Sequence, residues 1–199
     1  MSTIKTKKVQ LGTDANSANN FTIYQPATPD GTLRIGVGNA ENPTEVGQFN
    51  ANGYKPAIFP AFKVYMTTNQ SISNNTLTKI SFDNIRFDTT NNYDTVNYRW
   101  TPTVAGYYSV YLTVHPAMAS VNGHGYPLIR KNGSTYSLEY TQADTGNSSN
   151  GNCRVSALVY LNGTTDYIEA WFGHNFGTTK DIYYPEGYTF FQGHLVQQA

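Results

Sequence analysis

The sequence predicts an all-β protein, and two observations support this fold class. Apolar and polar residues alternate with a period of two in many short segments, and no ten-residue window has a convincing helical period. The composition is typical of short strands joined by tight turns, with 16 Tyr, 10 Phe, 17 Gly and 9 Pro among 199 residues. Many short strands with regular turn spacing indicate a β-sandwich or a β-barrel.

Charge and hydropathy argue against several functions. The chain has 13 basic and 13 acidic residues, and this balance argues against nucleic acid as the main partner, because phosphate binding needs a positive excess. No segment reaches the roughly 18 apolar residues of a membrane span, and residues 1–10 lack the apolar run of a secretory signal. We therefore expect a soluble protein without membrane insertion. The single cysteine, Cys153, cannot form an intrachain disulfide, and we interpret it as a small apolar strand residue.

The first 24 residues are polar, with short apolar alternations at residues 9–11 and 21–24 and a loop-forming composition between them. A segment with so few apolar residues cannot form a core of its own. It is expected to be either a disordered tail or an arm that pairs with another chain or particle. We predict an N-terminal attachment arm over residues 1–24. The candidate contact residues of this arm are Val9, Leu11, Phe21 and Ile23.

Residues 25–57 contain short strand signals, among them residues 32–37 and 44–49, separated by turn-forming sequences. Pro29-Asp30-Gly31 is one such turn, because Pro presets φ and Gly permits a positive φ. Two or three strands of this length are not stable alone in water. We predict a short β-rich linker or stalk that needs partners.

Residues 58–199 form the bulk of the chain and are predicted to be one β domain. Asn132-Gly133 and Asn162-Gly163 each lie between apolar runs, a pattern typical of a two-residue hairpin turn. The alternation of aromatic and β-branched residues predicts ten strands, at residues 61–67, 78–82, 85–89, 96–100, 106–114, 126–131, 134–140, 152–161, 166–172 and 189–196.

Several motifs follow one another in a specific order through this region. They are Pro60-Ala61-Phe62, Ile80-Ser81-Phe82-Asp83-Asn84-Ile85, Asn92-Tyr93-Asp94, Tyr98-Arg99-Trp100-Thr101-Pro102 with Ala105-Gly106-Tyr107-Tyr108-Ser109-Val110, Leu128-Ile129-Arg130-Lys131-Asn132-Gly133, residues 163–171, and Phe191-Gln192-Gly193-His194-Leu195-Val196. In this order they resemble the C1q-like domain, whose jelly roll is shared with the tumour necrosis factor family. One departure is the insertion of Thr164-Thr165 before Asp166.

The resemblance implies a ten-stranded jelly-roll sandwich that packs as a homotrimer around a threefold axis. Strand alternation agrees with this, because residues 107, 109 and 111 share one face and residues 108, 110 and 112 share the other. Both faces are too apolar for either to lie in water, so we expect one between the sheets and the other against a neighbouring chain. The expected trimer core consists of Phe62, Tyr107, Ser109, Tyr111 and Phe191. The alternative is a monomer with exposed tyrosines.

Short motifs of the first 57 residues resemble the leader of bacteriophage virion fibres and related tail or head proteins. They are Val9-Gln10-Leu11-Gly12-Thr13 with Asn20-Phe21-Thr22, Asp30-Gly31-Thr32-Leu33-Arg34-Ile35 with Gly38-Asn39-Ala40, and Phe49-Asn50-Ala51-Asn52-Gly53. This resemblance implies a virion location, after assembly in the host cytoplasm, and it makes the virion the partner that Val9, Leu11, Phe21 and Ile23 contact. It agrees with the lack of a secretory signal.

No catalytic motif stands out, and we predict neither an enzyme nor a cofactor. Asp166 and Glu169 are three residues apart on a strand and so point to opposite faces, which excludes a glycosidase pair. Asp83, Asp88 and Asp94 lie around turns, where oxygen ligands suit Ca²⁺. Their spacing fits no compact calcium loop, so turn formation is the preferred interpretation and Ca²⁺ the alternative.

The long polar loops at residues 173–185 and 141–152 are the predicted binding surface. Their mixture of aromatic rings and amides suits carbohydrate, because rings stack on sugar faces and amides bond hydroxyl groups. The equal alternative is that Tyr183 and Tyr184 pack into the edge of the sandwich. The candidate ligand-binding residues are His174, Asn175, Tyr183, Tyr184 and Asn147.

The sequence thus predicts a homotrimeric bacteriophage structural protein whose C1q-like head contacts a host surface glycan or protein. Its other partners would be proteins of the tail, the baseplate or the capsid. A tail or baseplate fibre is the first placement, and a capsid head fibre or decoration protein is the alternative. A secreted or cell-surface C1q-like binding module is the alternative of a different class.

Overall fold

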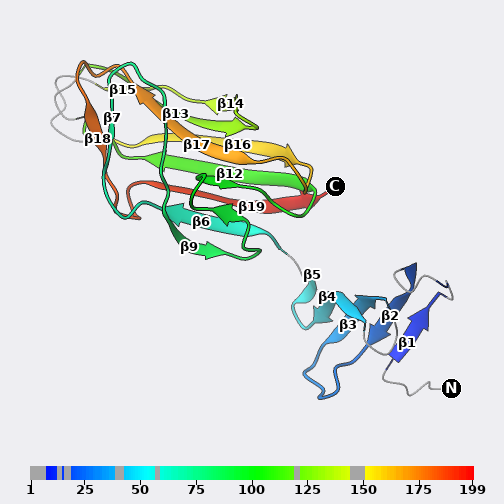
Figure 1. The fold of residues 1–199 in the computed structure, drawn as a ribbon. Coiled ribbons are helices and arrows are strands. Elements are labelled where there is room, and N and C mark those ends of the chain that lie inside the picture. Colours follow the sequence, from blue (N-terminus) through cyan, green and yellow to red (C-terminus); the bar gives the residue numbers. More distant parts are fainter. Residues whose placement is uncertain are drawn as a thin grey trace. The chain divides into compact units, whose positions relative to one another are not determined.

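The computed structural model describes residues 8–12, 15, 19–38, 43–56, 59–118, 122–143 and 151–199. The chain divides into two compact units, residues 1–59 and 60–199, which we call the leader and the head and describe separately (Figure 1). The described residues form an all-β structure, as the sequence predicts. None of them belongs to a helix long and apolar enough to cross a membrane.

The leader contains one antiparallel sheet in which each strand pairs with the next along the chain. Its strands are β1 (Lys8–Leu11), β2 (Phe21–Tyr24), β3 (Leu33–Val37), β4 (Thr44–Asn50) and β5 (Gly53–Pro56). The β2–β3 connection contains the expected turn, in which Gly31 has φ 80° and the Asp30 carboxylate accepts a hydrogen bond from the Thr32 N–H. The sequence predicted an arm and a separate linker, whereas β1 and β2 join β3–β5 in a single sheet.

The head is a sandwich of two sheets (Figure 1). The first, which we call the β12 sheet, has the order β16-β12-β19-β6-β9. The second, the β13 sheet, has the order β10-β11-β17-β13-β14, with β15 paired to β13 and β8 paired to β17. A small pair, β18 with β7, lies outside both sheets. The longer strands are β6 (Ala61–Tyr65), β9 (Asn84–Asp88), β12 (Gly106–Val114), β13 (Gly123–Lys131), β14 (Ser134–Leu138), β16 (Cys153–Leu161), β17 (Ile168–His174) and β19 (Phe190–Gln198). The short ones are β7 (Gln70–Ile72), β8 (Thr78–Lys79), β10 (Tyr93–Asp94), β11 (Arg99–Trp100), β15 (Thr141–Ala143) and β18 (Lys180–Ile182).

The head core lies between the two sheets and follows the period-two alternation of the strands. On β12, Tyr108, Val110 and Leu112 are fully buried, whereas Tyr107 is 45% exposed on the opposite face. Aromatic rings form the centre of the core: the Phe62 ring centroid lies 4.5 Å from that of Trp100 and 5.1 Å from that of Phe191. Cys153 is also buried there, which raises the pKa of its thiol to about 11.

Two of the residues expected in the trimer core belong to this internal core. Phe62 is 0% exposed and Phe191 is 1% exposed within one chain. Their assignment to the trimer interface is therefore wrong, because both rings point between the sheets, on the same side as Tyr108. Tyr107, Ser109 and Tyr111 lie on the opposite face, where a neighbouring chain could reach them.

The two predicted hairpin turns have different outcomes. Asn132 and Gly133 have φ 51° and 78° and join β13 to β14, so this turn is confirmed. The Asn162-Gly163 hairpin is wrong, because β16 pairs with β12 in one sheet and β17 pairs with β13 in the other. The segment after Leu161 therefore crosses between the sheets.

Candidate binding site

The face of the β12 sheet that points away from the core, here called the outer face, contains the features that bear on binding. Along the direction of its strands the outer face has two ends, which we call proximal and distal. The proximal end holds Gly106 with its partners Leu161 and Gln198 and lies near Pro60, where the head begins. The distal end holds Val114 and its partner Cys153. The two ends differ in chemistry.

Apolar side chains gather at the proximal end of the outer face, where they form what we call the proximal patch. Its members are Tyr107 at 45%, Leu158 at 60%, Tyr160 at 39% and Val196 at 55% exposure. Tyr107 pairs with Tyr160 across the strands, and their ring centroids are 5.5 Å apart. Exposed apolar groups clustered in this way are typical of an interaction surface.

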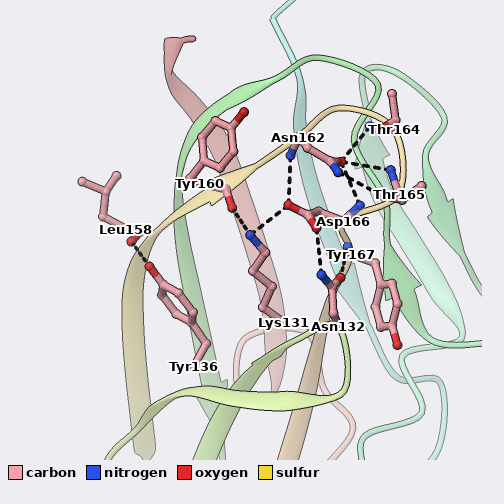
Figure 2. Close-up of polar contacts among 10 residues, drawn as sticks. All are labelled: Lys131, Asn132, Tyr136, Leu158, Tyr160, Asn162, Thr164, Thr165, Asp166 and Tyr167. Carbon is pink, nitrogen blue, oxygen red and sulfur yellow. Dashed lines mark hydrogen bonds and ion pairs between the residues drawn. The ribbon is translucent and has the colours of Figure 1, made fainter.

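A polar network fixes the backbone that presents this patch (Figure 2). The Lys131 ammonium donates to the Tyr160 carbonyl at 2.7 Å and pairs with the Asp166 carboxylate at 2.8 Å. The Tyr136 hydroxyl donates to the Leu158 carbonyl at 2.9 Å. These side chains satisfy carbonyls along the edge of β16. The Leu158 side chain points away from the network (Figure 2), whereas the Lys131 ammonium lies 5.6 Å from the centroid of the Tyr160 ring.

Asp166 and Asn162 organise the loop that crosses between the sheets. The Asn162 side-chain oxygen accepts hydrogen bonds from the N–H groups of Thr164, Thr165 and Asp166. The hydrogen bond from Lys131 is the main reason that the pKa of Asp166 is lower than its ordinary value. The inserted Thr164-Thr165 dipeptide is thus held by backbone hydrogen bonds to a single amide.

A cleft of about 310 Å³ lies at the distal end of the outer face. Its lining includes Tyr111 from β12, Arg154 from β16, and Glu139 and Tyr140 from the β14–β15 connection. The remaining lining residues are Thr141, Asn152, Val155 and Ser156. Its volume is at the lower end of the range of small-ligand sites.

The cleft combines aromatic rings with charges that have no ionic partner in the described part of the chain. Glu139 and Arg154 form no ion pair there, and they give the cleft a carboxylate acceptor and a guanidinium donor. The Tyr111 and Tyr140 rings offer apolar faces. This combination suits a ligand that has several hydroxyl groups on a ring. Each hydroxyl group can donate a hydrogen bond to the carboxylate or accept one from the guanidinium.

His115 borders the cleft and orients one of its lining residues. Its Nδ1 lies 2.7 Å from the Asn152 side-chain oxygen. The imidazole stacks on Tyr188, with centroids 4.6 Å apart, and lies 5.6 Å from the Tyr183 ring. Tyr183 therefore packs against the sandwich edge, which was one of the two interpretations of this tyrosine.

The structure separates the other residues predicted to bind a ligand. His174 is 0% exposed, so its assignment to an exposed loop is wrong: its Nε2 donates to the Ile72 carbonyl at 3.0 Å and its ring stacks on Phe176. Asn175 is exposed, and its side-chain oxygen accepts a hydrogen bond from the His124 N–H. Tyr184 is 46% exposed. Asn147 lies outside the described residues.

The three aspartates considered for calcium each serve their own local structure. Asp88 accepts hydrogen bonds from the N–H groups of Asn92 and Tyr93, and Asp94 accepts from that of Asn97. Asp83 accepts from the Thr67 N–H. Within the described residues, no three acidic, histidine or cysteine side chains are grouped to hold a metal ion.

The sequence analysis predicted only some of the residues that line the cleft. The polar loop of residues 141–152 was predicted to bind, and its two end residues, Thr141 and Asn152, line the cleft. Arg154 and Glu139 were missed. Arg154 follows the loop directly on the exposed side of β16, so its outward position was a usable signal; the contribution of Glu139 depends on the path of the β14–β15 connection.

Comparison with known proteins supports the fold and leaves the family open. Murine APRIL is similar, with a TM-score of 0.55 and 11% identity over 70% of this chain and 100% of its own. Eiger TNF from S. frugiperda matches with a TM-score of 0.51 and 9% identity, covering 73% of this chain and 96% of its own. The PRD1 vertex protein P5 matches with a TM-score of 0.50 and 14% identity, covering 70% of this chain and 96% of its own.

These likenesses confirm that the chain contains a C1q/TNF-like jelly roll. No family model matches the sequence, and no curated protein matches it. No enzymatic family is therefore identified.

Proposed function

We propose that this protein is a homotrimeric bacteriophage structural protein whose jelly-roll head points away from the particle and binds the host surface. One observation carries the proposal. The proximal patch is exposed on the outer face of the jelly roll, and the jelly roll is joined to a separate leader sheet. Three copies that bury this patch against one another would leave the distal ends free. The distal clefts would then be the recognition surface.

The chemistry of the distal cleft supports a saccharide as the host ligand. Tyr111 and Tyr140 supply ring faces, and Glu139 and Arg154, which form no ion pair with the described residues, supply charges of opposite sign. One open cleft of this size would bind weakly. Three copies on one rigid trimer would raise the avidity without any new contact.

The likeness to the PRD1 vertex protein supports a place on the particle surface. Between the two placements, it favours the capsid over the tail or baseplate, because that protein is named for a vertex. The leader would connect the head to the particle. Neither an enzyme nor a cofactor is part of this proposal.

Immunogold labelling of purified particles tests the placement. Gold at capsid vertices would support the capsid placement, and gold at the tail tip would support the tail fibre. Particles without label, with the protein free in the lysate, would contradict a virion role. A binding module released from the cell would then be the better interpretation.

A further inference from the structure

The leader sheet has one apolar face. In an antiparallel sheet, residues paired across strands point to the same side. The pairs Val9–Ile23, Ile23–Ile35 and Leu33–Phe49 extend one such side across four strands. We call this side the leader face; its apolar members are Val9, Leu11, Phe21, Ile23, Leu33, Ile35, Val37, Phe49 and Tyr54.

The opposite side of the sheet contains the charges. The register places Lys8, Arg34 and Lys55 on it, together with Glu45. The Arg34 guanidinium pairs with Glu45 at 2.9 Å and with Asp30 in the preceding turn at 2.6 Å. The charges of the sheet therefore lie on this side, although its Thr22 is fully buried, and none of the described charged side chains of β1–β5 points to the leader face.

No second layer of described residues covers the leader face. The hydrophobic core cluster consists of head residues, and the leader side chains stay open, with Leu11 at 52% and Leu33 at 48% exposure. An aromatic side chain buries about 150–250 Å² when covered, so Phe21, Phe49 and Tyr54, each about half exposed, leave roughly 300 Å² open. With the aliphatic members the open area is comparable to the largest apolar patch of a typical monomer, and such patches are often functional.

We propose that the leader face packs against the same face of the other copies of this chain. Its lack of charge supports this occupant, because identical faces meet without burying a like-charged or unpaired group. The inference rests on the proposed trimer, in which the heads hold three leader sheets at high effective concentration. Each sheet then becomes one wall of a three-sided shaft whose polar sides face water.

This packing gives a new role to the four residues expected to contact the virion. Val9, Leu11 and Phe21 lie on the leader face together with Ile23, so they join copies of the chain to one another. The charged side of the sheet would then contact the particle. The competing outcome is that a protein of the particle, and not another copy of this chain, covers the leader face.

Cysteine crosslinking with a short bismaleimide in the full-length chain separates these outcomes, because sheets packed face to face lie about 10 Å apart, which is farther than a disulfide spans. Leu33→Cys places a thiol on the leader face of the central strand, where identical residues of three copies meet. Gln48→Cys is the matched control, because Gln48 pairs with Arg34 and points to the charged side. The native Cys153 is buried and is not expected to react with the reagent in the folded protein.

The expected result is a shift of Leu33→Cys from the 22.1 kDa band to a band of twice that mass on a denaturing gel, while Gln48→Cys stays at 22.1 kDa. The solution mass of both variants is measured in parallel. A trimer without the Leu33→Cys band overturns the shaft and leaves the proposed head trimer intact. Equal trapping of both variants also overturns it, because contact would not be confined to the leader face. A monomer without trapping overturns both proposals.

Discussion

Tyr107 and Tyr160 lie side by side on the outer face of the head, with ring centroids 5.5 Å apart and about two-fifths of each side chain open to water. They come from neighbouring strands, and nothing in the described part of the chain covers them. In contrast, Tyr108, one residue along, is fully buried between the sheets. The pair is therefore available to another molecule without any change in the fold.

Replacing Tyr107 with Asp is expected to separate the copies while each head stays folded. A charge placed in a buried interface without a partner costs on the order of several kcal/mol, whereas the same charge on an exposed position of a monomer costs little. Size-exclusion chromatography with light scattering should show a shift toward 22.1 kDa with an unchanged circular dichroism spectrum. Val96→Asp is the control. Val96 is 81% exposed near β10, so the variant protein should remain trimeric. A Tyr107→Asp trimer would contradict this interface.

Replacing Asp166 with Asn is expected to destabilise the head. The change removes the ion pair with Lys131 and weakens the acceptor of the Asn162 N–H, so we expect a loss of about 1–3 kcal/mol in the free energy of unfolding. Denaturant titration at fixed protein concentration measures it. Glu139→Gln, which removes a carboxylate without an ion pair in the described residues, should stay within about 0.5 kcal/mol of the wild type. Equal losses of unfolding free energy in the two variants would contradict a stabilising role for the polar network in Figure 2.

The buried His174 makes stability depend on pH. Burial lowers its pKa below the ordinary value of 6.5, and its Nδ1 accepts a hydrogen bond from the Phe176 N–H, which a protonated ring could not do. The folded state therefore binds the proton less well than the unfolded state does. Stability from this group is fully present above about pH 6.5 and falls as the pH drops toward the folded pKa.

Thermal unfolding from pH 8 to pH 5 checks this expectation. The wild type should lose stability below about pH 6.5, and His174→Phe, less stable overall, should lose less over the same interval. If the thermal stability of both proteins fell by the same amount between pH 8 and pH 5, His174 would not be the cause of the pH dependence.

The distal cleft predicts which variants lose saccharide binding. Arg154→Ala and Glu139→Gln each remove one unpaired charged group, and loss of a charged hydrogen bond should weaken binding by about tenfold to a hundredfold. Binding of the full-length chain to purified envelope polysaccharide of the host, measured by surface plasmon resonance, tests this. Arg86→Ala is the control, because Arg86 is an exposed arginine outside the cleft. Unchanged binding by both cleft variants would place recognition elsewhere.

Local sequence patterns predicted the longer strands of the head, but not the short strands β7, β10, β15 and β18. The segment from Gly106 to Val114 was predicted with both ends correct, because large apolar residues alternate across it without interruption. β17 was expected to end at residue 172, yet it continues to His174, and this continuation explains why a predicted loop residue is buried. Gly173 and His174, which are not typical strand residues, hid the strand signal there.

Features that depend on long-range pairing could not be predicted from local patterns. The cleft brings Tyr111 beside Ser156 and Arg154 through the β12–β16 register, which no local motif encodes. The single leader sheet likewise follows from the pairing of Ile23 with Ile35 across a loop. The sequence therefore indicated which leader residues are apolar but not that they share one face.

The solution mass of the full-length protein tests the central claim most directly. Light scattering at micromolar concentration should give three times 22.1 kDa, because the proximal patch and the leader face both need other copies to cover them. The value should stay constant on dilution through the micromolar range. A stable species of 22.1 kDa with an intact β-sheet spectrum would contradict the trimer and, with it, the proposed fibre.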